Sequence, residues 1–334
     1  MSNLSILLLK ALEPWRNARA WHVALSGGLD STVLLHILAQ LRQTRSLPPL
    51  SAIHVHHGLQ AAADAWPAHC QALCDALGVP LQVVYVHVQA GASLERAARE
   101  ARYQAFVTLT RAQEVLLTGQ HRDDQAETLL FRLLRGAGVS GLAAMPRQRR
   151  LGEGNLCRPL LDVSRTDLEA YAREHSLSWI EDPSNQQTDF SRNYLRHEIF
   201  PLLTRRWPQA AASMARSAAH CAEAQGLLDD LARQDLQAAG AVSEFDWLGL
   251  PSLELAPITC LSPARQRNAL RYWLAAFSQL PDTDHWAGWD ALRDARGDGQ
   301  PLWKLAEGEL HRSGGRIWWL AGDWLCQPPA SVQW

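Results

Sequence analysis

The chain has 334 residues, of which 47% are hydrophobic and 20% charged, and its formal net charge is −2. This length predicts two domains with substantial cores, and the composition is typical of a globular protein rather than a disordered or fibrous one. The near-neutral charge gives no global signal for nucleic acid, and no apolar run reaches the length of a membrane span, so we expect no membrane association.

The first apolar run, residues 4–9, is closed by Lys10 and lacks a basic head and a cleavage site. We therefore expect no signal peptide and a cytoplasmic location. Strand-like and helix-like segments then alternate, which predicts an α/β fold: a doubly wound parallel sheet with helices on both faces. Beginning with a strand, the expected segments are 21–25, 32–41, 52–56, 61–77, 81–88, 93–112 (capped by Ser93), 115–118 and 123–134.

The pattern changes after residue 160. Short apolar pairs at 160–161 and 179–180 accompany a helix predicted over 165–175, a turn over 181–185 and a helix over 192–206. A long Ala-rich helix is then expected to connect to a smaller mixed domain that is rich in tryptophan. The helix is expected at 210–236 and the mixed domain at about 240–325, with a hairpin at 309–320 around Gly314-Gly315. A frayed tail is expected at Pro328-Pro329. The predicted domain bounds are 1–208 and 209–334.

A glycine turn joins the first predicted strand to the first predicted helix. Adjacent glycines let the backbone approach a ligand closely, and amides at a helix start attract an anion such as phosphate. An ordinary capped turn is the alternative interpretation. The turn is not a Walker loop, a dinucleotide fingerprint or a nucleophile elbow, because the Walker lysine, the third glycine and the Gly-x-Ser-x-Gly pattern are all absent. The turn reads Ser26-Gly27-Gly28-Leu29-Asp30-Ser31-Thr32.

A second polar cluster opens the helix predicted at 123–134. Asp123 and Glu127 are one turn apart on one face, and Asp124 is within reach of Glu127. The helix dipole alone explains one acid, but three acids beside His121 indicate a site. Together with Asp30, these carboxylates could hold Mg²⁺ or an amine substrate.

Three distant segments are expected to meet at one crevice. Ligands of such folds bind beyond the carboxyl ends of the strands, where Ser26, His56-His57 and His121 all lie. The His54, His56, His57 and His121 set is expected to line a nucleotide pocket or cap a strand rather than to bind a metal.

The cysteines and the late tryptophans favour structural roles. No Cys-x-x-Cys pair is present, so we expect small buried apolar cysteines rather than a zinc site. The tryptophans after residue 240 are expected to form core rather than base-stacking platforms. The six cysteines are Cys70, Cys74, Cys157, Cys221, Cys260 and Cys326.

Two arginine-rich stretches stand out from the neutral background. Residues 132–150 contain five arginines and no acid, and the second stretch has Glu198 as its only acid. Such patches bind phosphates, and a solvated face is the alternative reading. The second stretch contains Arg192, Arg196, Arg205 and Arg206.

The ordered motifs resemble one family. Ser-Gly-Gly-x-Asp-Ser resembles the loop of the PP-loop ATP pyrophosphatases, and His-x-x-Asp-Asp-x-x-Glu-Thr downstream of it resembles the tRNA(Ile)-lysidine synthase family. The resemblance is close over about 20–210 and looser to about 320. It continues through His54-Val55-His56-His57-Gly58-Leu59, Arg99-x-x-Arg102-Tyr103, Arg135-Gly136-x-Gly138, Gly141-Leu142, Arg158-Pro159-Leu160, Trp179 to Asn185 and Arg192-Asn193-x-x-Arg196.

The resemblance implies a reaction. ATP adenylates the C2 oxygen of the wobble cytidine in the CAU anticodon of tRNA(Ile), releasing pyrophosphate, and the amine of L-lysine then expels AMP. The family also implies a PP-loop catalytic domain at 1–208 and a tRNA-interacting part within 209–334. Many members continue into a further C-terminal domain, whereas this sequence stops soon after Trp318-Trp319, which leaves the catalytic residues intact. A homodimer is kept as a possible oligomeric state.

The expected roles follow from the residue types and the resemblance together. Asp30 and Glu127 are expected to bind Mg²⁺, Asp124 (or Asp123) to orient or deprotonate the lysine amine, and Arg192 to stabilise the adenylated cytidine. Arg99 and Arg102, three residues apart on one helix face, are expected to bind a phosphate or the lysine carboxylate, and an exposed helix charge is the alternative reading. ATP is assigned to Ser26, Gly27, Gly28, Leu29, Asp30, Ser31, Thr32, His57 and His121, and tRNA to Arg135, Arg147, Arg149, Arg150, Arg196, Arg205 and Arg206.

Two other functions remain open from the sequence. A tRNA cytidine thiolase would keep the adenylation but would need a reactive cysteine or an iron–sulfur cluster, and the missing Cys-x-x-Cys disfavours it. A non-catalytic nucleotide sensor on the same fold would not need four carboxylates.

Overall fold

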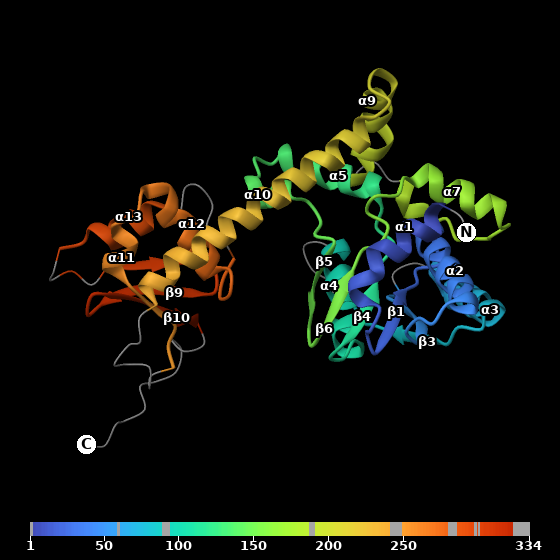
Figure 1. Ribbon diagram of the computed structural model, residues 1–334, viewed down its shortest axis with the longest axis horizontal. Coiled ribbons are helices and arrows are strands. Elements are labelled where there is room, and N and C mark those ends of the chain that lie inside the picture. The colour runs from blue at the N-terminus through green and yellow to red at the C-terminus, as the bar shows by residue number, and fades with distance from the viewer. Residues whose placement is uncertain are drawn as a thin grey trace, which may run out of the picture. The chain divides into compact units, whose positions relative to one another are not determined.

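The computed structural model divides the chain into two compact units, Met1–Ala222 and Glu223–Trp334 (Figure 1). Among the described residues, no helix combines the length and the apolar composition that a membrane span requires. Ser93, Leu59, Cys326 and Pro328-Pro329 lie outside these residues. The structure describes residues 3–58, 61–88, 94–186, 191–240, 249–279, 286–296, 299 and 301–322.

A six-stranded sheet forms the centre of the first unit, in the order β3-β2-β1-β4-β6-β5. Every neighbouring pair is parallel except β5 with β6, which is an antiparallel hairpin at the sheet edge. The doubly wound, mostly parallel sheet expected from the alternating segments is thus confirmed. The strands are β1 (Ala20–Ala24), β2 (Leu50–His56), β3 (Leu81–Tyr85), β4 (Glu114–Leu117), β5 (Gln148–Leu151) and β6 (Gly154–Cys157).

Helices cover both faces of this sheet. Trp21 and Val23 pack on one face into a buried cluster with α1, α2, α3 and α7, whereas Phe106 of α4 packs with Leu116 on the other. Alternation of side chains along each strand supplies apolar residues to both faces, as a sheet buried on both sides requires. These helices are α1 (Asn3–Leu12), α2 (Leu29–Thr44), α3 (Trp66–Leu77), α4 (Leu94–Leu109) and α7 (Arg165–Glu174).

Several elements of the first unit differ from the sequence expectation. The run 4–9 belongs to α1, and the β5–β6 hairpin was not predicted, because its strands have four residues each and are rich in arginine or glycine. The helix expected over 192–206 contains a π-helical turn. The remaining elements are η1 (Glu13–Trp15), η2 (Ala61–Ala65), α5 (Arg122–Leu133), α6 (Val139–Leu142), η3 (Pro183–Gln186), α8 (Ser191–Tyr194), the π turn η4 (Leu195–Ile199), α9 (Phe200–Arg206) and α10 (Ala210–Ala239), which crosses the unit boundary.

The second unit contains a four-stranded antiparallel sheet in the order β7-β10-β9-β8. Gly314 and Gly315 have φ values of 57° and 71°, so both occupy the left-handed region that a tight hairpin turn needs. The expected hairpin is therefore confirmed. The elements are β7 (Ser252–Glu254), α11 (Leu255–Thr259), α12 (Pro263–Leu274), α13 (Trp286–Asp294), β8 (Leu302–Lys304), β9 (Gly308–Ser313) and β10 (Arg316–Ala321).

Tryptophans and cysteines largely take the structural roles expected of them. Trp286, Trp289, Trp303 and Trp319 are buried in the core of the second unit. Cys70, Cys74 and Cys157 are buried, whereas Cys221 is half-buried and Cys260 is exposed, so the expectation was wrong for Cys260.

The side of β1 on which the next strand is added changes between β3 and β4. From β1 it proceeds to β2 and β3 on one side, and then returns to place β4 on the other side of β1. A crevice opens at such a switch point beyond the carboxyl ends of the strands. Gly119, directly after β4, packs there against the start of α2: a Cβ on Gly119 would lie 3.0 Å from the carbonyl carbon of Asp30 and the nitrogen of Ser31.

Gly119→Ala is expected to destabilise the first unit by about 1–3 kcal/mol, because rigid backbone meets the new methyl group. Denaturant unfolding measures the loss. Gly138→Ala is the matched control, since nothing lies within 4 Å of a Cβ there. Equal stability of the two variants would contradict the close packing of β4 on α2.

Candidate active site

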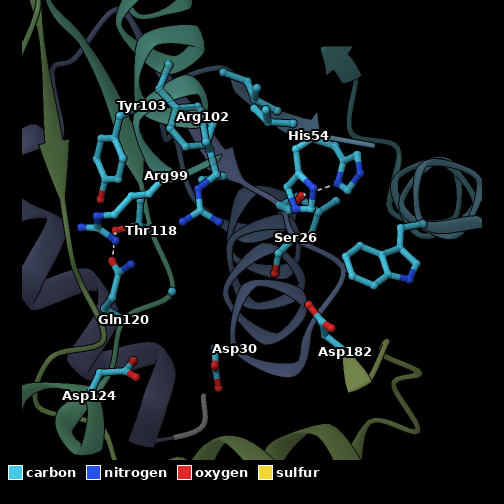
Figure 2. Close-up of a pocket in the computed structure, with 18 of the residues that line it drawn as sticks. Ser26, Asp30, His54, Arg99, Arg102, Tyr103, Thr118, Gln120, Asp124 and Asp182 are labelled. Carbon is cyan, nitrogen blue, oxygen red and sulfur yellow. Dashed lines mark hydrogen bonds between the residues drawn. The ribbon is translucent and has the colours of Figure 1, made fainter. Parts of the chain in front are cut away.

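A cavity of about 330 Å³ lies at the switch point (Figure 2). Its walls come from the ends of β1, β2 and β4, from the starts of α2, α3 and α5, and from α4 and the segment after α7. We call it the central cavity. It is lined by Ala24, Leu25, Ser26, Asp30, Ile53, His54, Val55, His57, Trp66, Arg99, Arg102, Tyr103, Phe106, Thr118, Gly119, Gln120, Asp124, Asp182 and Arg192.

The glycine turn is held in a fixed shape by its own hydroxyls. The Ser31 Oγ donates to the Gly28 carbonyl at 3.1 Å, and the Ser26 Oγ lies 3.0 Å from the Ser31 Oγ and accepts from the Gly28 amide at 3.2 Å. Gly28 is the N-cap of α2, so the first amides of that helix are presented beside the cavity. Such amides, with the positive end of the helix dipole, attract an anion.

Gly27 is required by the backbone conformation of this turn. Its φ is 85°, and a Cβ there would lie 2.7 Å from the Cδ1 of Ile180. The Ile180 amide also donates to the Gly27 carbonyl at 2.8 Å. The segment after α7 is thereby bound to the turn, which positions Asp182 at the rim of the cavity (Figure 2).

His121 organises the acids at the start of α5. Its Nδ1 accepts from the Asp123 amide at 3.2 Å, while Asp124 Oδ2 accepts from the His121 amide at 3.1 Å, which forms a capping box. The His121 Nε2 lies 3.7 Å from Asp30 Oδ1 and 3.5 Å from Asp124 Oδ2. One buried imidazole therefore joins the glycine turn to the acid cluster.

Burial and charge shift the pKa values of this group. Burial raises the pKa of Asp30, and the nearby Asp124 adds to the shift while His121 opposes it. For His121, burial alone would lower the pKa, but the hydrogen bond with Asp123 and the charges of Asp124 and Asp30 outweigh it and raise the pKa. The neighbouring carboxylates thus favour the protonated imidazole, a form in which Nδ1 carries a proton and no longer accepts from the Asp123 amide.

Two arginines hold the deepest carboxylate, Glu127, which is only 3% exposed. Arg192 donates its Nε to Glu127 Oε2 at 2.9 Å, and Arg196 donates its Nε to Oε1 at 2.7 Å and its Nη2 to Oε2 at 2.8 Å. Both guanidinium groups also donate to Asp124 Oδ1 at 3.0 Å. Asp30, His121, Asp124, Glu127 and the two arginines consequently form one connected polar network.

A second cavity of about 460 Å³ adjoins the first and shares Arg99, Gln120 and Arg192 with it. Four of its side chains are arginines, so we call it the arginine pocket. It is lined by Arg99, Gln120, Glu127, Thr128, Phe131, Arg132, Met145, Arg158, Ser191 and Arg192.

Some residues expected to bind ATP or to take part in catalysis lie behind the cavity wall. Leu29 is in the apolar core, and Thr32 is fully buried with its Oγ1 directed to the Gly27 carbonyl. His121 is 1% exposed. Asp123 accepts from the Arg165 amide at 3.0 Å and is not among the residues that line the two cavities. The structure thus gives these four side chains supporting positions.

The residues expected to bind tRNA occupy two kinds of environment. Arg196, which we expected at an RNA surface, instead directs its guanidinium to buried carboxylates, and this corrects its placement. Arg147 is exposed but paired with Asp162. The other five are exposed: Arg135, Arg149, Arg150, Arg205 and Arg206.

Several lining residues received no role from the sequence. Asp182 was noted only within a motif, and Trp66, Thr118 and Gln120 were not singled out. His54, by contrast, was expected to line a pocket or cap a strand, and it lines the central cavity. Thr118 and Gln120 follow β4 closely, and this position would have indicated them, because strand ends face the crevice.

Asp30 fits the role of a magnesium ligand better than Glu127 does. The Asp30 Oδ1 is buried without a hydrogen-bond partner, whereas both oxygens of Glu127 accept from guanidinium groups, beside which a cation would be repelled. Among the described residues, no three His, Cys, Asp or Glu side chains meet as a metal-binding group.

The fold and the site together define a nucleotide-using enzyme domain of the PP-loop class. Residues 2–203 match the family model described as PP-loop domain, and residues 253–318 match the TilS substrate binding domain. The chain belongs to the tRNA(Ile)-lysidine synthase family, whose members are enzymes, and its PP-loop domain implies the use of ATP.

The relatives support this assignment over nearly the whole chain. The tRNA(Ile)-lysidine synthase of Pseudomonas fluorescens is 68% identical over 327 residues, which cover 98% of this chain and 74% of the relative. That of Coxiella burnetii is 43% identical, covering 93% and 68%. The U34-tRNA thiolase NcsA from Methanococcus maripaludis, solved with its [4Fe-4S] cluster, has a TM-score of 0.54 at 17% identity, covering 66% of this chain and 78% of its own, and shows the shared fold alone.

The raised pKa of His121 makes stability depend on pH. The proton is bound more tightly in the folded than in the unfolded state, so its stabilisation is complete below the unfolded pKa of 6.5 and is lost as pH rises through the folded pKa. His121→Asn keeps a helix cap but removes the titration. We expect the free energy of unfolding of this variant to fall less above pH 6.5 than that of the wild type; parallel curves would contradict this.

Proposed function

We propose that this protein ligates L-lysine to C2 of the wobble cytidine in the CAU anticodon of tRNA(Ile), using ATP and releasing AMP and pyrophosphate. The observation that carries the proposal is the convergence, around one cavity, of the glycine turn, three acids and three arginines. Asp30, Asp124 and Arg192 come from α2, α5 and α8, Ser26 comes from the turn before α2, and all four line the same space.

In the first step, the C2 oxygen of the cytidine bonds to the α-phosphorus of ATP, and the bond to the pyrophosphate breaks. Such a transfer depends on positioning and on charge stabilisation rather than on a covalent nucleophile. We assign the departing pyrophosphate to the amides at the start of α2, together with Ser26 and Ser31. Ser31 would have to release the Gly28 carbonyl to donate to it. Arg192 borders both cavities and is placed to stabilise the charge on the adenylated cytidine.

In the second step, the ε-amine of lysine bonds to C2, AMP leaves, and the amine loses a proton. A protonated amine has no lone pair for attack, so a carboxylate must orient it or accept its proton. We assign this role to Asp124, which lines the central cavity. Because Asp124 Oδ1 accepts from Arg192 and Arg196, an entering amine would compete with these guanidinium groups. Arg99 and Arg102 line the same cavity and are assigned to the lysine carboxylate.

Mg²⁺ is proposed at Asp30, where it would neutralise the phosphates of ATP. The role of Glu127 as a second ligand stays a prediction and requires Arg192 and Arg196 to release its oxygens. In the arginine-bound state, Glu127 positions the two guanidinium groups.

We assign residues 1–208 to catalysis and ATP binding, and residues 209–334 to a helical connector and a tRNA-interacting domain. The exposed arginines of the first unit are the proposed RNA contacts there. A cytoplasmic location and a homodimer stay predictions.

Neither alternative function gains support from the site. Burial raises the pKa of Cys70 to about 12 and that of Cys74 to about 11, so neither thiol is a ready sulfur carrier. A nucleotide sensor would have no use for the buried acid cluster opposite the glycine turn.

Asp30→Ala and Glu127→Ala are each expected to lower adenylation at least about 100-fold, because each removes charge control at the reacting phosphate. The assay incubates ATP, Mg²⁺, labelled lysine and tRNA(Ile) with a CAU anticodon, and measures pyrophosphate release and lysine incorporation. Asp75→Asn, on the exposed side of α3, is the control. Near-normal turnover in either alanine variant would refute its role, and a wild-type enzyme that binds ATP without turnover would indicate a sensor.

Substituting Arg147, Arg149 and Arg150 together with glutamine is expected to weaken tRNA binding and to flatten its salt dependence by up to about three units of logarithmic slope, since each phosphate contact releases a counterion. Fluorescence anisotropy at several salt concentrations measures the slope. An unchanged slope would make this patch an ordinary solvated surface.

A further inference from the structure

The arginine pocket carries more positive charge than its own acids neutralise. Of its lining residues, Arg99, Arg132, Arg158 and Arg192 are basic and Glu127 alone is acidic. Glu127 is already bound by Arg192 and by Arg196 from outside the pocket. Among the described residues, no carboxylate forms an ion pair with the first three of these arginines.

Arg158 is the unusual member of this set. It follows β6 directly and is 4% exposed, although arginine is almost never fully buried without a charged partner. Its Nη1 donates to the Pro146 carbonyl at 2.6 Å, and it also interacts with the Tyr103 hydroxyl. Its Nε is buried without a hydrogen-bond partner. Arg158 is therefore a desolvated cation whose Nε–H group has no acceptor.

The groups around Arg158 add to the positive charge. Arg99 and Arg149 each lie against the Tyr103 ring, at 4.9 Å and 5.2 Å from its centroid. Burial lowers the pKa of Arg158, the Tyr103 hydroxyl opposes this, and Arg149 and Arg99 add to the lowering. A bound anion would offset the repulsion from Arg149 and Arg99 and would give the buried guanidinium a charged partner.

We propose that the arginine pocket, with Arg158 at its base, binds a backbone phosphodiester of the tRNA anticodon loop. The inference rests on the proposed function and assigns a substrate contact beyond it. Arg149 and Arg150 lie on the exposed strand β5, and the Arg149 guanidinium contacts the Tyr103 ring beside the pocket. Positive charge therefore extends from the surface to the pocket.

The position of the pocket matches this ligand. It shares Arg99, Gln120 and Arg192 with the central cavity, so a phosphate held there would lie next to the nucleotide that reacts. A lysine carboxylate has suitable charge, but it would leave unexplained the arginines that continue out to β5. Phosphate contacts of this kind fix the register of an RNA without reading its sequence.

Arg158→Gln tests the proposal in the full chain with the tRNA(Ile) CAU transcript as the probe. We expect about five- to tenfold weaker binding, a salt slope lower by about one, and an unchanged KM for lysine. Arg158→Lys should keep the slope, because it keeps the charge. Arg42→Gln, an exposed charge on α2, is the control.

The outcomes separate this proposal from other roles. A raised lysine KM with unchanged tRNA affinity would assign the pocket to the amino acid and overturn the proposal. Weaker binding with the wild-type salt slope would indicate a structural role and would equally overturn it. If the wild-type enzyme neither binds this tRNA nor incorporates lysine, the proposed function itself fails.

Ethylation interference on the wild-type enzyme supplies a measurement that needs no variant. Neutralising one phosphate of the anticodon loop at a time should weaken binding at the phosphate that occupies the pocket. That position should lose its effect in Arg158→Gln, because this variant has already lost the contact with the phosphate. An absence of interference anywhere in the loop would overturn the proposal.

Discussion

The site depends on one electrostatic constraint: several carboxylates are buried beside a glycine turn whose helix amides attract an anion. Unpaired, these charges would repel both one another and the substrate, and burial would protonate them. The structure resolves this by placing His121 between Asp30 and Asp124, and by binding Glu127 to Arg192 and Arg196. The fold can therefore keep acids near the phosphates because cations accompany them.

The same constraint explains why α5, α8 and the π turn come together. Arg192 and Arg196 reach the acids of α5 from residues about 65–72 positions away in the sequence. The π-helical turn begins at Leu195, between the two arginines in the chain. Such turns are common at functional sites, since they alter how side chains project from a helix. Here two arginines of one helical segment meet the same pair of carboxylates.

Much of the fold could be predicted from the sequence because its signals are local. Apolar runs alternate with helical patterns up to α5, and Gly78, Gly136 and Gly314-Gly315 have the positive φ values expected at turns and helix ends. The β5–β6 hairpin was not predicted, because arginine dominates β5 and gives no strand signal. Pairing with neighbouring strands, rather than local propensity, stabilises this hairpin.

The site was predicted less completely than the fold. Motif spacing predicted that Ser26, Asp30 and Asp124 lie at one crevice, but it could not show which side chains form hydrogen bonds or ion pairs with each other. Arg196 resembled a surface cation in the sequence, and only the tertiary contact with Glu127 shows that it lies inward. Pairing between distant residues depends on packing, which periodicity does not encode.

The arginine-bearing strand β5 has a consequence for the solution behaviour of the chain. It is the terminal strand of its sheet, and such an edge offers unpaired backbone groups to any other extended chain. Arg149 and Arg150 are exposed along this border. Because like charges resist close approach, these arginines disfavour the addition of a strand from a neighbouring molecule to this edge of the sheet. The surface that we propose to contact RNA therefore also discourages aggregation.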